Sequence, residues 1–115
     1  MKLYIIRKQT KGIMGGIKFE LQVRVALTDE EVDLVKKYKV NKESILKKVV
    51  KVPLTSKTLP LDLTIESLIA GRKFKSDDIA EILEYEKIIK EFCEAFKNNL
   101  EVMKNFGGRE VIEYK

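Results

Sequence analysis

The sequence predicts an α+β fold in two layers, in which an antiparallel sheet, made from an N-terminal hairpin and a C-terminal strand, packs against one long helix and two shorter helices. Apolar and polar residues alternate from residue 17 to residue 27, which is the period of a strand with one buried face. Apolar residues recur at intervals of three and four from residue 79 to residue 106, which is the period of an amphipathic helix. With 115 residues, 44% of them hydrophobic, the chain can build one core, so we expect residues 1–115 to form a single domain.

The N-terminal hairpin is predicted from two strand-like runs and the glycines between them. Residues 3–8 form a β-rich run, and residues 17–27 form the alternating one. Gly12, Gly15 and Gly16 supply backbone conformations that a chain reversal needs.

Two short helices are predicted from their capping signals. Thr28 followed by Glu31 is a capping box, so a helix begins at Asp29. Thr64 and Gly71 bracket an apolar stripe and predict a second short helix between them.

The segment between these helices is less defined. Residues 43–54 fit both a helix and a strand, and Pro53 would confine such a strand to a sheet edge. Residues 55–63 are expected to form a connecting loop.

Ser76 is predicted to cap the long helix, which covers residues 77–106 and ends at Gly107. Residues 109–114 then form a short final strand. One unbroken helix of this length spans about 45 Å, whereas a domain of this size has a radius of gyration near 13 Å. One end should therefore protrude, unless the helix breaks near Asn98 and Asn99.

A protruding apolar stripe needs a cover, and a second copy of the chain supplies one most simply. We therefore expect a nonenzymatic protein-interaction module that forms a homodimer through its long helix and hairpin tip. The candidate partner contacts are Ile13, Met14, Phe96, Leu100 and Met103.

Charge segregation predicts an alternative function, nonspecific nucleic-acid binding. Residues 1–75 hold 17 basic and 8 acidic residues, a net charge of +9, whereas residues 76–115 hold 6 and 10, a net charge of −4. Such a basic surface attracts a phosphate backbone, although lysine-rich helix faces are also often simply solvated. The candidate contacts are Lys36, Lys37, Lys39, Lys42, Lys47, Lys48 and Lys51, with Arg72, Lys73 and Lys75 from a basic loop that buries Phe74.

Several chemistries are disfavoured by composition. The chain has no histidine, and its single Cys93 lies between Phe92 and Phe96, a setting typical of a buried hydrophobic residue. The glycines at 12, 15 and 16 lack the sequence and context of a phosphate-binding Walker loop. We therefore expect no catalytic residues, no metal and no cofactor. No apolar run is long enough to span a membrane, and we expect a cytoplasmic protein.

Overall fold

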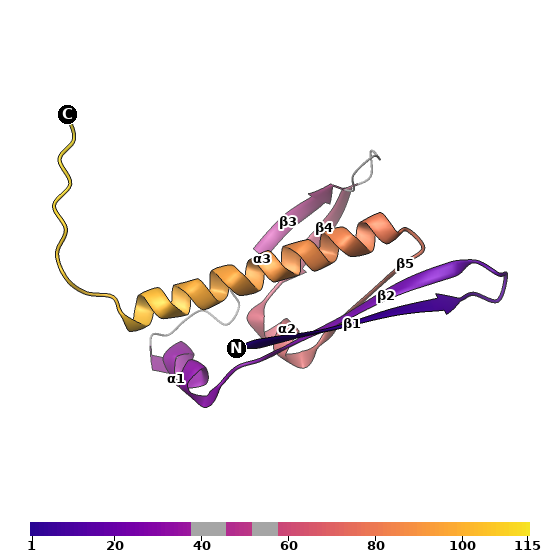
Figure 1. Ribbon diagram of the computed structural model, residues 1–115, viewed down its shortest axis with the longest axis horizontal. Coiled ribbons are helices and arrows are strands. Elements are labelled where there is room, and N and C mark those ends of the chain that lie inside the picture. Colours follow the sequence, from indigo (N-terminus) through magenta and orange to yellow (C-terminus); the bar gives the residue numbers. More distant parts are fainter. Residues whose placement is uncertain (38–45, 52–57) are drawn as a thin grey trace.

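The chain forms five strands and three helices within residues 1–37, 46–51 and 58–115, which the computed structural model describes (Figure 1). The α+β class is therefore confirmed. In chain order the elements are β1 (Lys2–Lys11), β2 (Ile17–Ala26), α1 (Asp29–Lys37), β3 (Leu46–Lys51), β4 (Thr58–Leu63), α2 (Ile65–Ala70), β5 (Arg72–Ser76) and α3 (Ile79–Lys104).

The main sheet has the strand order β1-β2-β5 and is antiparallel throughout. The predicted hairpin is confirmed, since β1 and β2 pair from Lys2 opposite Ala26 to Lys11 opposite Ile17. Gly15 has φ 83° in the connecting turn, a conformation that favours glycine.

The third strand of this sheet is β5, where the sequence indicated a basic loop. It pairs with β2 from Phe19 opposite Ser76 to Val23 opposite Arg72. Phe74 is buried, as expected.

The predicted C-terminal strand at residues 109–114 is wrong for the single chain. After α3 the backbone is extended and forms no strand, because a strand needs a neighbour along its length and this segment leaves the body of the molecule (Figure 1).

A second, two-stranded sheet lies between α1 and α2 in the sequence. Its strands β3 and β4 pair from Leu46 opposite Leu63 to Lys51 opposite Thr58. A strand thus replaces the loop predicted for 58–63, and the strand reading is correct for 46–51. Residues 43–45 and 52–57, which include the start of the predicted loop, lie outside the described part of the chain.

The short helices begin where their caps predicted. Thr28 and Glu31 form the capping box of α1, with the Thr28 backbone N–H donating to Glu31 Oε1 at 2.9 Å. Thr64 and Ser67 form an equivalent box at α2, which ends at Gly71. The predicted cap of α3 is wrong by two residues. Asp78 caps α3 by accepting from the Ala80 backbone N–H at 2.9 Å, and Ser76 closes β5.

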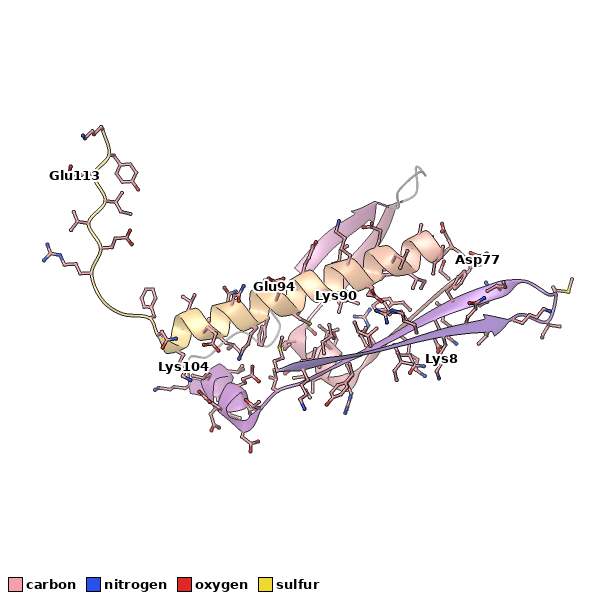
Figure 2. The ribbon with its side chains drawn as sticks, in the orientation of Figure 1. Lys8, Asp77, Lys90, Glu94, Lys104 and Glu113 are labelled. Carbon is pink, nitrogen blue, oxygen red and sulfur yellow. The ribbon has the colours of Figure 1, made fainter. Side chains whose placement is uncertain are left out.

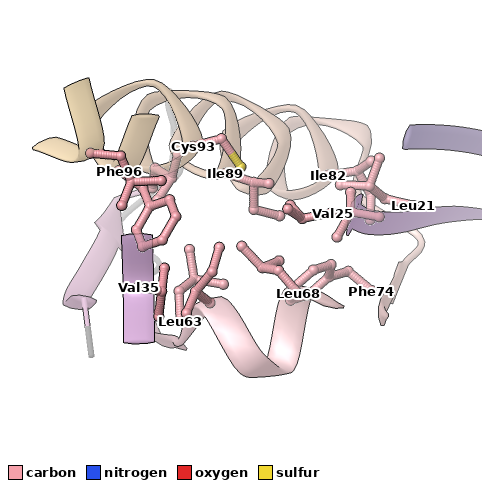
Figure 3. Close-up of a cluster of buried hydrophobic side chains, with 14 residues drawn as sticks. Leu21, Val25, Val35, Leu63, Leu68, Phe74, Ile82, Ile89, Cys93 and Phe96 are labelled. Atoms are coloured by element: carbon pink, nitrogen blue, oxygen red, sulfur yellow. The ribbon is translucent and has the colours of Figure 1, made fainter. Parts of the chain in front are cut away.

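The long helix α3 is unbroken over its 26 residues, about 39 Å at 1.5 Å per residue. The predicted alternative, a break near Asn98 and Asn99, is therefore wrong. Packing of α3 against β2 and β5 encloses the core, which α1 and α2 complete (Figure 3). Leu21, Leu68 and Ile89 are fully buried there. The second sheet also packs on α3, through β3, so α3 contacts more than the main sheet. The two-layer arrangement of the whole chain therefore stays a prediction.

The molecule is elongated, with extents of 62 × 42 × 18 Å and a radius of gyration of 18.0 Å. A compact chain of this length would have a radius of gyration near 13 Å. The tip of the β1–β2 hairpin and residues 106–115 both project from the body (Figure 1).

Candidate functional site

The main sheet has two faces with different environments. Residues at odd positions of β1 and β2 point toward α3. Leu21 and Val23 are buried there, whereas the odd-numbered residues from position 7 to position 17, toward the hairpin tip, are exposed. The other face is mostly exposed to solvent, and Figure 2 shows Lys8 on the side of the hairpin away from α3. We call this second surface the open face. It consists of Lys2, Tyr4, Ile6, Lys8 and Thr10 of β1, Lys18, Glu20, Gln22, Arg24 and Ala26 of β2, and Lys73 and Lys75 of β5.

The open face is strongly basic. Its charged side chains are six cations and one carboxylate, Glu20. The Gln22 amide donates to Glu20 Oε2 at 2.8 Å, and Lys75 Nζ lies 3.6 Å from Glu20 Oε1. This hydrogen bond and the neighbouring lysine charges lower the pKa of Glu20 from its usual value. Glu20 therefore stays ionised at neutral pH and offsets part of one lysine, while most of the positive charge is unopposed.

An aromatic ring lies within this basic surface. Tyr4 is 45% exposed, and the Arg24 guanidinium lies 5.2 Å from the centre of its ring, a cation–π contact. Tyr4 and Arg24 line a depression of about 580 Å³, which also reaches Gly71 and Lys73. A flat ring beside cations can stack on a planar, negatively charged ligand.

The sequence prediction found part of this surface. Lys73 and Lys75 lie on β5, where the sheet aligns them with Gln22 and Glu20. Arg72 belongs to the opposite face of β5, the face that carries the buried Phe74, and its guanidinium lies 5.1 Å from the centre of the Phe74 ring.

The other predicted lysines either lie on other elements or fall outside the described part of the chain. Lys36 and Lys37 lie in the last turn of α1. Lys39 and Lys42 lie outside the described residues. Lys47, Lys48 and Lys51 belong to β3 in the second sheet, and their side chains also lie outside the described part.

Five residues of the open face were missed because they are far apart in the sequence. Strand pairing brings them together: Tyr4 lies opposite Arg24, and Lys8 opposite Glu20. The signal that could have found them is the alternation of the hairpin, because four of the six cations in its two strands are at even-numbered positions. The missed residues are Lys2, Tyr4, Lys8, Lys18 and Arg24.

The predicted partner contacts divide between surface and core. Ile13 and Met14 at the hairpin tip are fully exposed, and Met103 is partly buried. Phe96 and Leu100 are 9% and 1% exposed because they pack into the core. The stripe of α3 is thus covered largely within one chain, which removes the reason to expect a partner on it.

The thiol of Cys93 lies on the buried face of α3 among apolar side chains. Burial raises the pKa of Cys93 to about 11, so the reactive thiolate is scarce at neutral pH. In the described ranges, no three acidic or cysteine side chains gather closely enough to hold a metal ion. No described helix combines the length and apolar character of a membrane span.

No protein-family model, curated protein or solved structure matches the chain. The chemistry of its surfaces is therefore the basis for a functional assignment.

Proposed function

We propose that this protein is a nonenzymatic nucleic-acid-binding protein that holds a single strand across the open face. The observation that carries the proposal is the composition of that face, six cations and one carboxylate around an exposed tyrosine. Neutralising phosphates with lysine and arginine releases counterions, which supplies most of the affinity of nonspecific nucleic-acid binding.

The shape of the open face favours a single strand over a duplex. Specific readers of duplex DNA usually insert a helix or a strand ribbon into a groove. The open face is instead the broad side of a sheet, with Tyr4 at its surface and Arg24 beside it. Sheets that bind single strands stack bases on such aromatic side chains while nearby cations contact the phosphates.

Binding is expected to depend weakly on sequence. Reading base edges needs side chains with paired donors and acceptors. Gln22 is the one amide side chain of the open face, and its amide nitrogen already donates to Glu20. Arg24 can leave the Tyr4 ring for a phosphate, at the loss of a cation–π contact of about 0.5–1 kcal/mol.

The test is fluorescence anisotropy with a labelled single strand of about 15 nucleotides, long enough for the usual site sizes of single-strand-binding sheets. If all six cations contact phosphates, the logarithm of the binding constant should fall against the logarithm of salt with a slope of about −4, at about −0.7 per contact. The same titration with the matching duplex should give weaker binding.

A matched pair of variants locates the site. Lys73→Glu reverses a charge on the open face, and Lys87→Glu makes the same change on α3, where Lys87 is exposed. Near 0.1 M salt each lost contact weakens binding about fivefold, so Lys73→Glu should raise the dissociation constant by that factor or more. Equal effects of the two variants, or no binding of either strand at low salt, would refute the proposal. Tighter binding to anionic lipid vesicles than to nucleic acid would also refute it.

A further inference from the structure

Residues 106–115, here called the C-terminal segment, are extended and project from the body of the molecule (Figure 1). Its apolar side chains face solvent: Phe106 is 85% exposed, Val111 71%, Ile112 60% and Tyr114 90%. Figure 2 shows Glu113 far from the sheet and from α3. Apolar residues gathered on an exposed segment usually mark an interaction site.

The outer edge of β1 is unpaired in the described chain and can form hydrogen bonds with a further strand. β1 pairs with β2 along ten residues, and in the described chain no other strand pairs with it. Unpaired edges accept strands from other chains, and lysines on an edge discourage pairing with an identical basic edge. β1 carries Lys2, Arg7, Lys8 and Lys11. It therefore favours a strand that brings a carboxylate to one of these cations. The C-terminal segment is neutral overall, with Arg109 and Lys115 beside Glu110 and Glu113, so the register of pairing decides which charges meet.

We propose that the C-terminal segment of one copy adds as an antiparallel strand to β1 of a second copy, and that the exchange is reciprocal. One register makes three matched cross-strand pairs on the open face. Glu110 lies opposite Lys8, Ile112 opposite Ile6, and Tyr114 opposite Tyr4. Opposite charges, aliphatic pairs and aromatic pairs are the combinations that stabilise neighbouring strands.

The chain's own segment cannot reach this register. The helix α3 runs antiparallel to β1, as two sets of contacts show. Near the start of α3, Glu86 Oε1 lies 2.6 Å from Arg7 Nε, toward the far end of β1. Further along α3, Lys97 lies 3.1 Å from the Glu31 carboxylate, which is also 2.7 Å from the Met1 amine at the start of β1. The end of α3 therefore lies beyond the Met1 end of β1.

The distances exclude an intramolecular version. Lys8 is seven residues from Met1, about 23 Å along a strand. The four residues from Phe106 to Glu110 span at most about 14 Å. A segment folded back along its own β1 would also run parallel to it. The antiparallel register thus requires a second copy, and reciprocal exchange gives a closed twofold dimer.

Gly108 supports an exchange of this kind. It has φ 96°, which L side chains rarely adopt, and it directs the segment away from α3. The pair Gly107 and Gly108 leaves the direction of the segment adaptable while α3 stays fixed.

The dimer is tested by sedimentation equilibrium on the full chain with a charge swap. Glu110→Lys or Lys8→Glu alone places like charges opposite each other at both copies of the interface, and should raise the dimer dissociation constant about tenfold or more. Combining both changes should restore the dimer. Glu94→Lys makes the same charge change on the exposed side of α3 and should have no effect. A monomer at every concentration, or a dimer that ignores Glu110→Lys, overturns the proposal.

A disulfide trap then tests the register and the origin of the strand. Ile6→Cys combined with Ile112→Cys should give a covalent dimer under oxidising conditions, since facing residues of antiparallel strands have Cβ atoms close enough to bridge. Ile6→Cys with Glu113→Cys places the second thiol on the opposite face and should give none. A covalent link confined to the monomer would show that the segment folds back on its own chain and would overturn the proposal. Neither experiment involves nucleic acid, so this inference and the proposed function fail independently.

Discussion

Replacing Glu31 by glutamine should destabilise the protein in a way that depends on pH. Glu31 is 3% exposed and joins three elements. Its carboxylate lies 2.7 Å from the Met1 amine at the start of β1 and 3.1 Å from Lys97 Nζ on α3, and it accepts from the Thr28 backbone N–H at the start of α1. Glutamine keeps the size of the side chain and removes the charge.

The magnitude follows from the pKa of Glu31. Burial alone would raise this pKa, but the hydrogen bonds from the Met1 amine, Thr28 and Lys97 together lower it from 4.5 to about 2. Since one pKa unit corresponds to about 1.36 kcal/mol, the ionised carboxylate contributes about 3 kcal/mol to the free energy of unfolding. A lowered pKa stabilises above the unfolded value of 4.5, and the contribution is lost as pH falls from 4.5 toward 2.

Urea unfolding followed by circular dichroism measures this effect. Glu31→Gln should lose about 3 kcal/mol at neutral pH, and the difference from the native chain should shrink toward zero as pH falls to about 2. The control is Glu101→Gln, because Glu101 pairs with the same Lys97 at 3.1 Å but is exposed. That change should cost less than about 0.5 kcal/mol. Equal stability of the Glu31→Gln and native chains at neutral pH, or a difference that does not vary with pH, would refute the reasoning.

Three further predictions concern the core, the open face and the thiol. Ile89→Ala should lower the free energy of unfolding by about 2–5 kcal/mol because Ile89 is fully buried, whereas Leu83→Ala should change it little because Leu83 is 54% exposed; urea unfolding distinguishes them. Tyr4→Ala should weaken single-strand binding by about fivefold or more in the anisotropy assay, since base stacking contributes about 1–3 kcal/mol, and Tyr4→Phe should retain it. The Cys93 thiol should react with an aromatic disulfide reagent only as fast as the protein unfolds, because burial raises its pKa to about 11, and rapid labelling of the folded chain would contradict that burial.

Local signals in the sequence predicted the hairpin and both short helices. The alternation of β2 specifies which side chains face the core, whatever the strand pairs with. The cap at Thr28 closes within three residues, as does the one at Thr64. Such signals depend on neighbours in the sequence, so they predict local structure without knowledge of the tertiary contacts.

The elements that were mispredicted depend on distant partners. β5 buries one large apolar side chain, Phe74, between two lysines, so its sequence resembles a basic loop until β2 pairs with it. The opposite error concerns the C-terminal segment, where a strand was predicted for residues 109–114 and none forms in the single chain. Its strand pattern indicates how residues 109–114 would pair, but it does not indicate whether the partner strand belongs to the same chain.

The open face was only partly predictable for the same reason. Lys73 and Lys75 lie together in the sequence and were identified. Lys8 and Arg24 join them only through the pairing of β1 with β2 and of β2 with β5. The lysine-rich stretch around Lys36 was predicted as a binding surface because its lysines are close together in the sequence. The cations of the open face are instead dispersed in the sequence and are brought together by three strands.

Mapping of amide shifts by NMR during titration with a single-stranded oligonucleotide tests the binding surface most directly. The largest changes should fall on the open face, at Tyr4, Lys8, Arg24 and Lys73, and should reverse when salt is added. The amides of α3 around Lys87 should stay nearly unchanged. Changes concentrated on α1 near Lys36 or along α3, with the open face unaffected, would contradict the assignment of this surface to nucleic acid.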